Sequence, residues 1–141
     1  MELIKRNTDY ALRVLTLMGK YKKGHIIFAK DLAASEAVPL VYLHKILQKL
    51  QRSGIIKSYR GRFGGGFSLN REIKKVTLQE IMEIAQGKFA INRCFIVHGR
   101  CSRSKHCPIH KQLQQVQKNI DRALHKVTLA RLVKARGQAE E

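Results

Sequence analysis

After Pro39 the pattern of apolar residues changes abruptly from that of a helix to that of two short strands. Apolar residues recur three and four positions apart from Leu43 to Leu50, which predicts the buried face of a helix that begins near Pro39. Gly54 is expected to end this helix. Two stretches rich in β-branched and aromatic residues then flank the glycine-rich segment 61–66, which predicts a β-hairpin. A helix that leads directly into a hairpin favours a winged helix-turn-helix fold.

Two more helices are expected before this one. Asn7 or Thr8 can cap the first with a side-chain oxygen. The second covers residues 30–36 and ends in a turn at 37–38, so that it forms a helix-turn-helix with the helix that follows. The buried stripe predicted for the first helix consists of Ala11, Val14, Leu15 and Met18.

Beyond the hairpin, Thr77 and Glu80 have the spacing of a capping box, which predicts a fourth helix that ends at Gly87. A long helix is expected to open at Pro108, and residues 128–133 are expected to form a last short helix before a frayed end. The predicted fold class is therefore mostly α with a small β-hairpin wing and a long C-terminal helix.

The long helix carries a narrow apolar seam, typical of a coiled coil, which predicts dimerisation through this helix. The alternative is that the seam packs against the chain's own domain. The residues of the seam are Leu113, Val116, Ile120, Ala123 and Val127.

The charge of the chain favours a polyanionic partner. Its formal net charge is +18, and no acidic residue occurs between positions 37 and 71. Double-stranded DNA is the expected partner, with a simple solvated basic face as the alternative. No apolar run is long enough to cross a bilayer, so no membrane partner and a soluble, cytoplasmic protein are expected.

The helix after Pro39 and the hairpin after it supply the candidate DNA-binding residues. In a helix-turn-helix the start of the second helix reads base edges and its later residues contact phosphates. Wing glycines let the backbone approach DNA closely, and wing arginines can reach a minor groove or its phosphates. The candidates are Tyr42, His44 and Lys45 for bases, Lys49 for phosphates, and Arg60, Arg62, Gly64 and Gly65 in the wing.

All the cysteines of the chain, Cys94, Cys101 and Cys107, lie within fourteen residues, and His110 follows closely. Three thiolates and an imidazole can converge on one soft metal centre. Zinc loops usually hold closer cysteine pairs, so the spacing favours an iron-sulfur cluster while leaving zinc open. A cysteine set without any ligand is the other alternative, and a disulfide is not expected in a chain without a secretion signal.

The ordered set of residues 8–13, 42–43, 60–66 and 128–129, together with the three cysteines, resembles the Rrf-two (Rrf2) family of winged-helix transcription regulators (IscR/NsrR/RirA-like). The resemblance covers nearly the whole chain. It implies a dimeric bacterial regulator, usually a repressor, and an iron-sulfur cluster held by the cysteines. One departure is His44, which stands where IscR-like members have a glutamate, so the operator sequence cannot be transferred.

The resemblance also implies two candidates for the fourth ligand. His110 occupies the place of the histidine that favours a 2Fe-2S cluster, whereas Asp9 occupies the place of an aspartate that favours a 4Fe-4S cluster. His110 is preferred because it is local to the cysteines. The expected division is a DNA-binding domain over 1–87, a cluster-binding loop over 88–111, and a dimerisation helix and tail over 112–141.

The expected function is therefore a regulator whose operator affinity responds to iron-sulfur status, redox state or nitric oxide. A zinc-stabilised or metal-free DNA-binding regulator with redox-active cysteines is the alternative. An enzyme is not expected, because no paired carboxylates, catalytic triad or nucleotide loop stand out.

Overall fold

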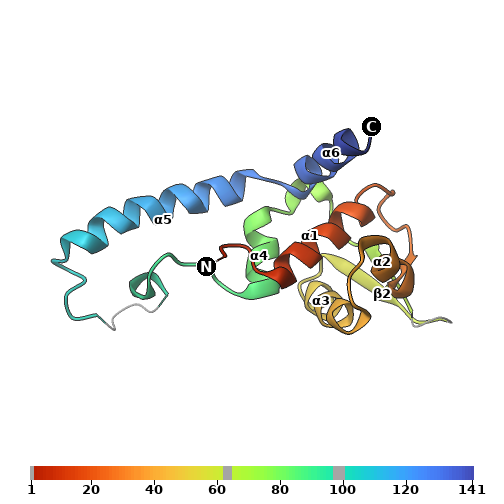
Figure 1. Ribbon diagram of the computed structural model, residues 1–141, viewed down its shortest axis with the longest axis horizontal. Helices are drawn as coiled ribbons and strands as arrows, with labels where there is room; N and C mark the ends of the chain where they lie inside the picture. The colour runs from red at the N-terminus through yellow and green to blue at the C-terminus, as the bar shows by residue number, and fades with distance from the viewer. Residues whose placement is uncertain (1, 62–64, 97–100) are drawn as a thin grey trace.

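The computed structural model describes residues 2–61, 65–96 and 101–141 and shows a body of helices packed around a small sheet, from which one long helix projects (Figure 1). Within these residues there are six α-helices, two short 3-10 helices and one three-stranded sheet. In chain order the elements are α1 (Arg6–Met18), β1 (Ile27–Phe28), α2 (Ala29–Glu36), α3 (Leu40–Arg52), β2 (Ile56–Tyr59), β3 (Gly66–Leu69), η2 (Ile73–Lys75), α4 (Leu78–Gln86), η3 (Arg93–Phe95), α5 (Pro108–Lys126) and α6 (Leu129–Glu140).

The core of the body lies where α1, α3 and α4 meet. Both predicted apolar stripes are confirmed, since every member of them is buried. Burying an aliphatic side chain of this size stabilises a fold by about 1.5–3 kcal/mol, so these stripes fix which face of each helix points inward. The buried members are Ala11, Val14, Leu15 and Met18 on α1 and Leu43, Ile46, Leu47 and Leu50 on α3.

The tight turn between α2 and α3 is also confirmed. Ala37 adopts the left-handed conformation with φ 53°, and the N–H of Val38 donates to the carbonyl of Ala33 at 3.1 Å. Pro39 is the N-cap of α3, one position before the first helical residue. The turn therefore sets α2 and α3 as the two helices of a helix-turn-helix.

The start of α1 differs from the prediction, because neither Asn7 nor Thr8 caps it. The N-cap is Lys5, and no side chain within the helix caps it. Gln86, at the end of α4, takes that role: its Oε1 accepts from the backbone N–H of Lys5 at 3.0 Å and from the hydroxyl of Thr8, while its Nε2 donates to the carbonyl of Leu3 at 2.9 Å. A distant side chain thus satisfies a donor that local capping residues usually satisfy.

The predicted hairpin is confirmed and belongs to a sheet of order β1-β3-β2. β2 and β3 are antiparallel, with Ile56 opposite Leu69. β1 pairs with the other edge of β3, which is the central strand. Strand β1 is not among the predicted elements, because two residues are too few to show a strand periodicity. Residues 62–64 of the wing, including Arg62 and Gly64, lie outside the described residues.

The N-terminus of α4 is built as predicted, because the hydroxyl oxygen of Thr77 accepts from the N–H of Glu80 at 3.1 Å. The carboxylate of Glu80 forms an ion pair with Arg71. Thr77 also forms an antiparallel bridge with Thr128, so the junction between α5 and α6 is attached to the start of α4.

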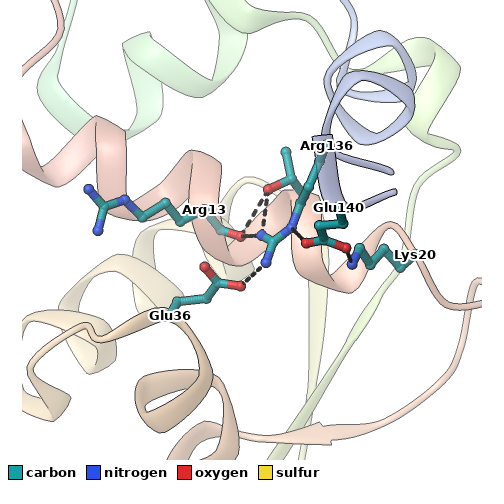
Figure 2. A network of polar contacts seen from close by, with 6 residues as sticks. Arg13, Lys20, Glu36, Arg136 and Glu140 are labelled. Carbon is teal, nitrogen blue, oxygen red and sulfur yellow. Dashed lines mark hydrogen bonds and ion pairs between the residues drawn. The ribbon is translucent and has the colours of Figure 1, made fainter. Parts of the chain in front are cut away.

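The expectation of a short last helix and a frayed end is wrong, since α6 continues to Glu140. Figure 2 shows the reason: the guanidinium of Arg136 forms an ion pair with Glu36 of α2 and donates to the carbonyl of Arg13 at 3.0 Å. Glu140 accepts from Arg136 and pairs with Lys20. These contacts attach the C-terminal turns of α6 to the winged-helix body. The last residues of α6 are therefore helical and packed rather than frayed.

None of the helices in the part of the chain that the structure describes combines the length and the apolar character that a membrane crossing requires.

Candidate functional site

The outward face of α3 carries the predicted base-reading residues. Tyr42, His44 and Lys45 are exposed, because the buried stripe of the same helix points to the core. Lys49 is also exposed, but its Nζ donates to the carbonyl of Ala85 in the last turn of α4 at 3.2 Å. A cation near a helix C-terminus interacts favourably with the helix dipole. Lys49 therefore links α3 to α4 in addition to carrying charge on the exposed face.

Tyr42 is the aromatic member of this face and lies beside α1. Its ring centroid is 6.4 Å from that of Tyr10, and the guanidinium of Arg13 lies 5.8 Å from the Tyr10 ring centroid. Arg13 also forms an ion pair with Asp9 at 2.8 Å. The carboxylate of Asp9 thus has a partner on its own helix, and this helix lies within the winged-helix body (Figure 1).

The described part of the wing places Arg60 on the surface directly after β2. Gly65 has φ 86°, and a Cβ built at this position would lie 3.0 Å from the carbonyl oxygen of Tyr59. Only glycine adopts this conformation without strain, so the residue is required by the hairpin itself. The basic face of α3 and the wing are consecutive in the chain, which places the two parts of the expected DNA-binding surface next to each other.

Cys94, Cys107 and His110 are brought together at the outer end of α5. The Sγ of Cys94 lies 3.3 Å from Nδ1 of His110. Cys107 is the N-cap of α5, and its Sγ accepts from the backbone N–H of His110 at 3.5 Å. The sulfur of Cys107 therefore lies at the free N–H groups of the first turn of α5.

Cys101 is more exposed than the other two cysteines. It lines the same cavity of about 700 Å³ as Cys94, Cys107 and His110. Among the residues that the structure describes, however, no three Cys, His, Asp or Glu side chains are arranged to hold one metal ion. All four predicted donors therefore border one space, but they do not converge on one point.

The imidazole of His110 is held on its other side by Phe95. The two rings are stacked, with centroids 4.9 Å apart and an interplanar angle of 23°. Sequence reasoning missed Phe95, because an aromatic residue next to a cysteine carries no motif of its own. Its role is visible only once η3 and α5 are placed side by side.

Basic residues flank these donors in the sequence, and no acidic residue occurs between positions 84 and 120. Arg93, Arg103 and Lys105 belong to the described part of this segment. Nearby cations lower the cost of holding several thiolates in one place.

Helix α5 packs on the body with a face other than its apolar seam. Among the described residues of α5, Gln117 is the buried one. The helix contacts α4. Val116 of the seam is 46% exposed, and Leu113 and Ile120 are only half-buried. The seam is therefore only partly covered within the single chain.

A helix-turn-helix with a basic exposed helix, followed by a sheet-based wing, defines a winged helix-turn-helix protein of the kind found in transcription regulators. The chain belongs to the Rrf2 family, whose model, described as an iron-dependent transcriptional regulator, matches residues 4–135. The recognised resemblance is thereby confirmed. The family and its named members are regulators, which confirms that this chain is not an enzyme.

Individual relatives agree with this assignment. The HTH-type transcriptional regulator NsrR of Geobacillus kaustophilus is 29% identical over 92% of this chain and 88% of its own length. Among solved structures, T. potens IscR has a TM-score of 0.72 at 21% identity, over 98% of this chain and 90% of that one. Oxidized CymR of Staphylococcus aureus has a TM-score of 0.71 at 22% identity, over 94% and 96% of the two chains. These structures support the fold.

Proposed function

We propose that this Rrf2-family regulator is a homodimeric, cytoplasmic repressor that binds an iron-sulfur cluster and changes its affinity for a double-stranded DNA operator with the state of that cluster. The observation that carries the proposal is the shared cavity at the outer end of α5, which three cysteines and one histidine line. Thiolate and imidazole donors of this kind suit iron-sulfur clusters.

The donors proposed to hold the cluster are Cys94, Cys101, Cys107 and His110. They fit the group chemically, because sulfur and imidazole are its usual donors, Cys94 and His110 already lie 3.3 Å apart, and Cys107 caps the helix that carries His110. A bound cluster would supply a centre that reacts with oxidants and nitric oxide. The cations Arg93, Arg103 and Lys105 would offset its negative charge.

The choice between His110 and Asp9 favours His110 and therefore a 2Fe-2S cluster. The imidazole of His110 faces Cys94 within the chain, whereas the carboxylate of Asp9 is paired with Arg13 on α1. Asp9 would have to leave this partner to serve a cluster of a second subunit. A 4Fe-4S cluster with Asp9 remains the alternative.

Dimerisation is proposed to use the apolar seam of α5, with a second copy of the chain as its partner. The seam has the spacing of a coiled coil, and the described residues of the chain leave Val116 largely uncovered. Pairing through α5 would set the distance between the two α3 helices, because α5 is attached to the body through α4 and α6. A change in the state of a cluster at the outer end of α5 would thereby be transmitted to the DNA-binding surface.

The proposed division of labour follows from these roles. Residues 1–87 bind DNA, residues 88–111 hold the cluster, and residues 112–126 pair two subunits. The remaining helix, α6, packs against α1 and supports the DNA-binding domain.

A second candidate is a zinc-containing or metal-free regulator with redox-active cysteines. It is favoured by the absence, within the described residues, of three donors around one point. Exposure of Cys101 also leaves a thiol open to oxidants.

Anaerobic purification followed by an absorption spectrum and by iron, sulfide and zinc analysis tests the proposal. The expected result is a coloured protein with iron and sulfide, and operator affinity that changes when Cys94, Cys101 and Cys107 are replaced together by alanine. A colourless protein that takes up no iron on reconstitution would refute the proposal, and stoichiometric zinc would support the second candidate.

The fourth ligand is tested with His110→Ala and Asp9→Asn. Loss or a changed spectrum of the cluster is expected for His110→Ala, with Asp9→Asn like the wild type. The reverse pattern would assign Asp9.

A further inference from the structure

Gln117 is a buried amide on a helix whose surface is otherwise largely open. Gln117 as a whole residue is 7% exposed to solvent. Its Oε1 accepts from the backbone N–H of Ile91 at 2.8 Å, and its Nε2 donates to Oδ1 of Asp121 at 2.9 Å. Burying an amide is unfavourable unless its groups are hydrogen-bonded, and here both ends have a partner.

Asp121 fixes which way this amide points. A carboxylate only accepts, so it holds the Nε2 side of Gln117 and leaves Oε1 to face the N–H of Ile91. The reversed amide would set two donors against each other at Ile91 and two acceptors against each other at Asp121. The pair therefore forms an oriented attachment point for the segment that precedes the cysteines.

Gln117 and His110 lie on the same face of α5. They are seven residues apart, which is about two helical turns. His110, in the first turn of α5, contacts Cys94 and Phe95. Gln117, two turns further along the same face, accepts from the N–H of Ile91.

The attachment at Ile91 is transmitted to Cys94 over three residues. The side-chain oxygen of Asn92 accepts from the N–H of Arg93 at 2.7 Å and so caps η3. The N–H of Phe95 donates to the carbonyl of Asn92 at 3.1 Å. This short connection leaves little freedom between the anchored Ile91 and the thiol of Cys94.

We propose that Gln117 is a positioning residue, which acts through Ile91 and η3 to hold Cys94 opposite Cys107 and His110. The inference rests on the proposed function for what the thiols hold, but the attachment itself belongs to the protein alone. Asp121 orients the amide and is part of the same device. Groups that orient metal ligands in this way typically change metal affinity by about 10- to 100-fold when removed.

The matched control is Gln115, which is also a glutamine of α5 with a bond to the residue four positions later. Its Nε2 donates to Oδ1 of Asn119 at 3.3 Å on the exposed surface, and its side chain makes no hydrogen bond to the described residues of the cysteine segment. Gln115→Ala thus removes a glutamine side chain and its i to i+4 hydrogen bond from α5, but it leaves the hydrogen bond between Gln117 and Ile91 in place.

Hydrogen exchange on the metal-free protein tests the attachment. In Gln117→Ala the amides of Ile91 and Phe95 are expected to exchange about tenfold faster than in the wild type, and in Gln115→Ala at the wild-type rate. Amides of the α1 core, such as that of Leu15, report whether the variant is folded. Unchanged exchange at Ile91 and Phe95 in a folded Gln117→Ala protein would overturn the proposal.

Cluster stability tests the consequence for the site. After anaerobic reconstitution, Gln117→Ala is expected to lose iron to a chelator at least tenfold faster than the wild type and Gln115→Ala. Gln117→Glu combined with Asp121→Asn is expected to recover most of the lifetime, because the introduced carboxylate accepts from Ile91 and the introduced amide donates to that carboxylate.

Equal iron loss in the wild type and Gln117→Ala would overturn the positioning role while leaving the cluster proposal intact. A wild-type protein that binds no iron would instead refute the proposed function, and the exchange rates at Ile91 and Phe95 would still decide whether Gln117 holds the segment.

Discussion

The carboxylate of Glu36, at the end of α2, forms an ion pair with the guanidinium of Arg136, one hundred residues later in α6 (Figure 2). The side chain of Glu36 is only 8% exposed. Arg136 also donates to the hydroxyl of Thr16 at 3.1 Å, so it joins the C-terminal helix to both α1 and α2. Helix α2, the first helix of the helix-turn-helix, is therefore attached to the C-terminal helix α6.

Replacing Arg136 by alanine is expected to lower the free energy of unfolding by about 2 kcal/mol, because the buried carboxylate of Glu36 loses its charged partner. Lys134→Ala, an exposed change on the same helix, is expected to stay within about 0.5 kcal/mol of the wild type. Urea denaturation followed by circular dichroism measures both. Equal stability of the two variants would show that the ion pair contributes nothing net.

Gly65→Ala is expected to destabilise the protein by about 2 kcal/mol, since alanine at φ 86° is strained and its Cβ would crowd the carbonyl of Tyr59. The matched control is Gly61→Ala, where a Cβ meets no atom within 4 Å. Thermal unfolding of both variants checks this. A similar fall in Tm for both would mean that the strain at Gly65 is not the cause.

Lys49→Ala is expected to weaken binding to specific and nonspecific DNA by similar factors and to reduce the slope of log K against log salt by about one. The expected cause is the loss of the phosphate contact proposed for Lys49 on the exposed face of α3. Lys118→Ala on α5 removes the same charge away from that face. Fluorescence anisotropy titrations at several salt concentrations separate the two, and an equal change in slope for Lys118→Ala would argue against a local contact.

Val116→Glu is expected to raise the dimer dissociation constant about 100-fold, because a charge in the middle of an apolar seam costs about 3 kcal/mol when it is buried without a partner. Lys118→Glu places the same carboxylate on α5 outside the seam. Sedimentation equilibrium is the measurement. If Val116→Glu and Lys118→Glu associate alike, the subunits do not meet along this seam.

Local sequence patterns determined most of the secondary structure. The spacing from Leu43 to Leu50 predicted both the helix and its buried side, and Thr77 predicted the start of α4, because these signals depend on neighbours within one or two turns. The same reasoning fixed the exposed face of α3 by elimination. It could not find β1, whose two residues are defined only by pairing with β3.

The candidate site was predicted in part. The grouping of Cys94, Cys107 and His110 follows from their short separation, and the structure brings these three together. Nothing local in the sequence indicated that the face of α5 carrying His110 and Gln117 contacts the segment before the cysteines.

The sequence by itself thus determined the helices apart from the length of α6, the hairpin and the identity of the soft donors, because each depends on residues close along the chain. Only the tertiary structure decided that Gln86 caps α1, that Arg136 holds α2, that Phe95 stacks on His110, and that Gln117 holds Ile91. Each of these contacts joins parts of the chain that come together only when the core forms, and side-chain hydrogen bonds and ring contacts act over a few ångströms.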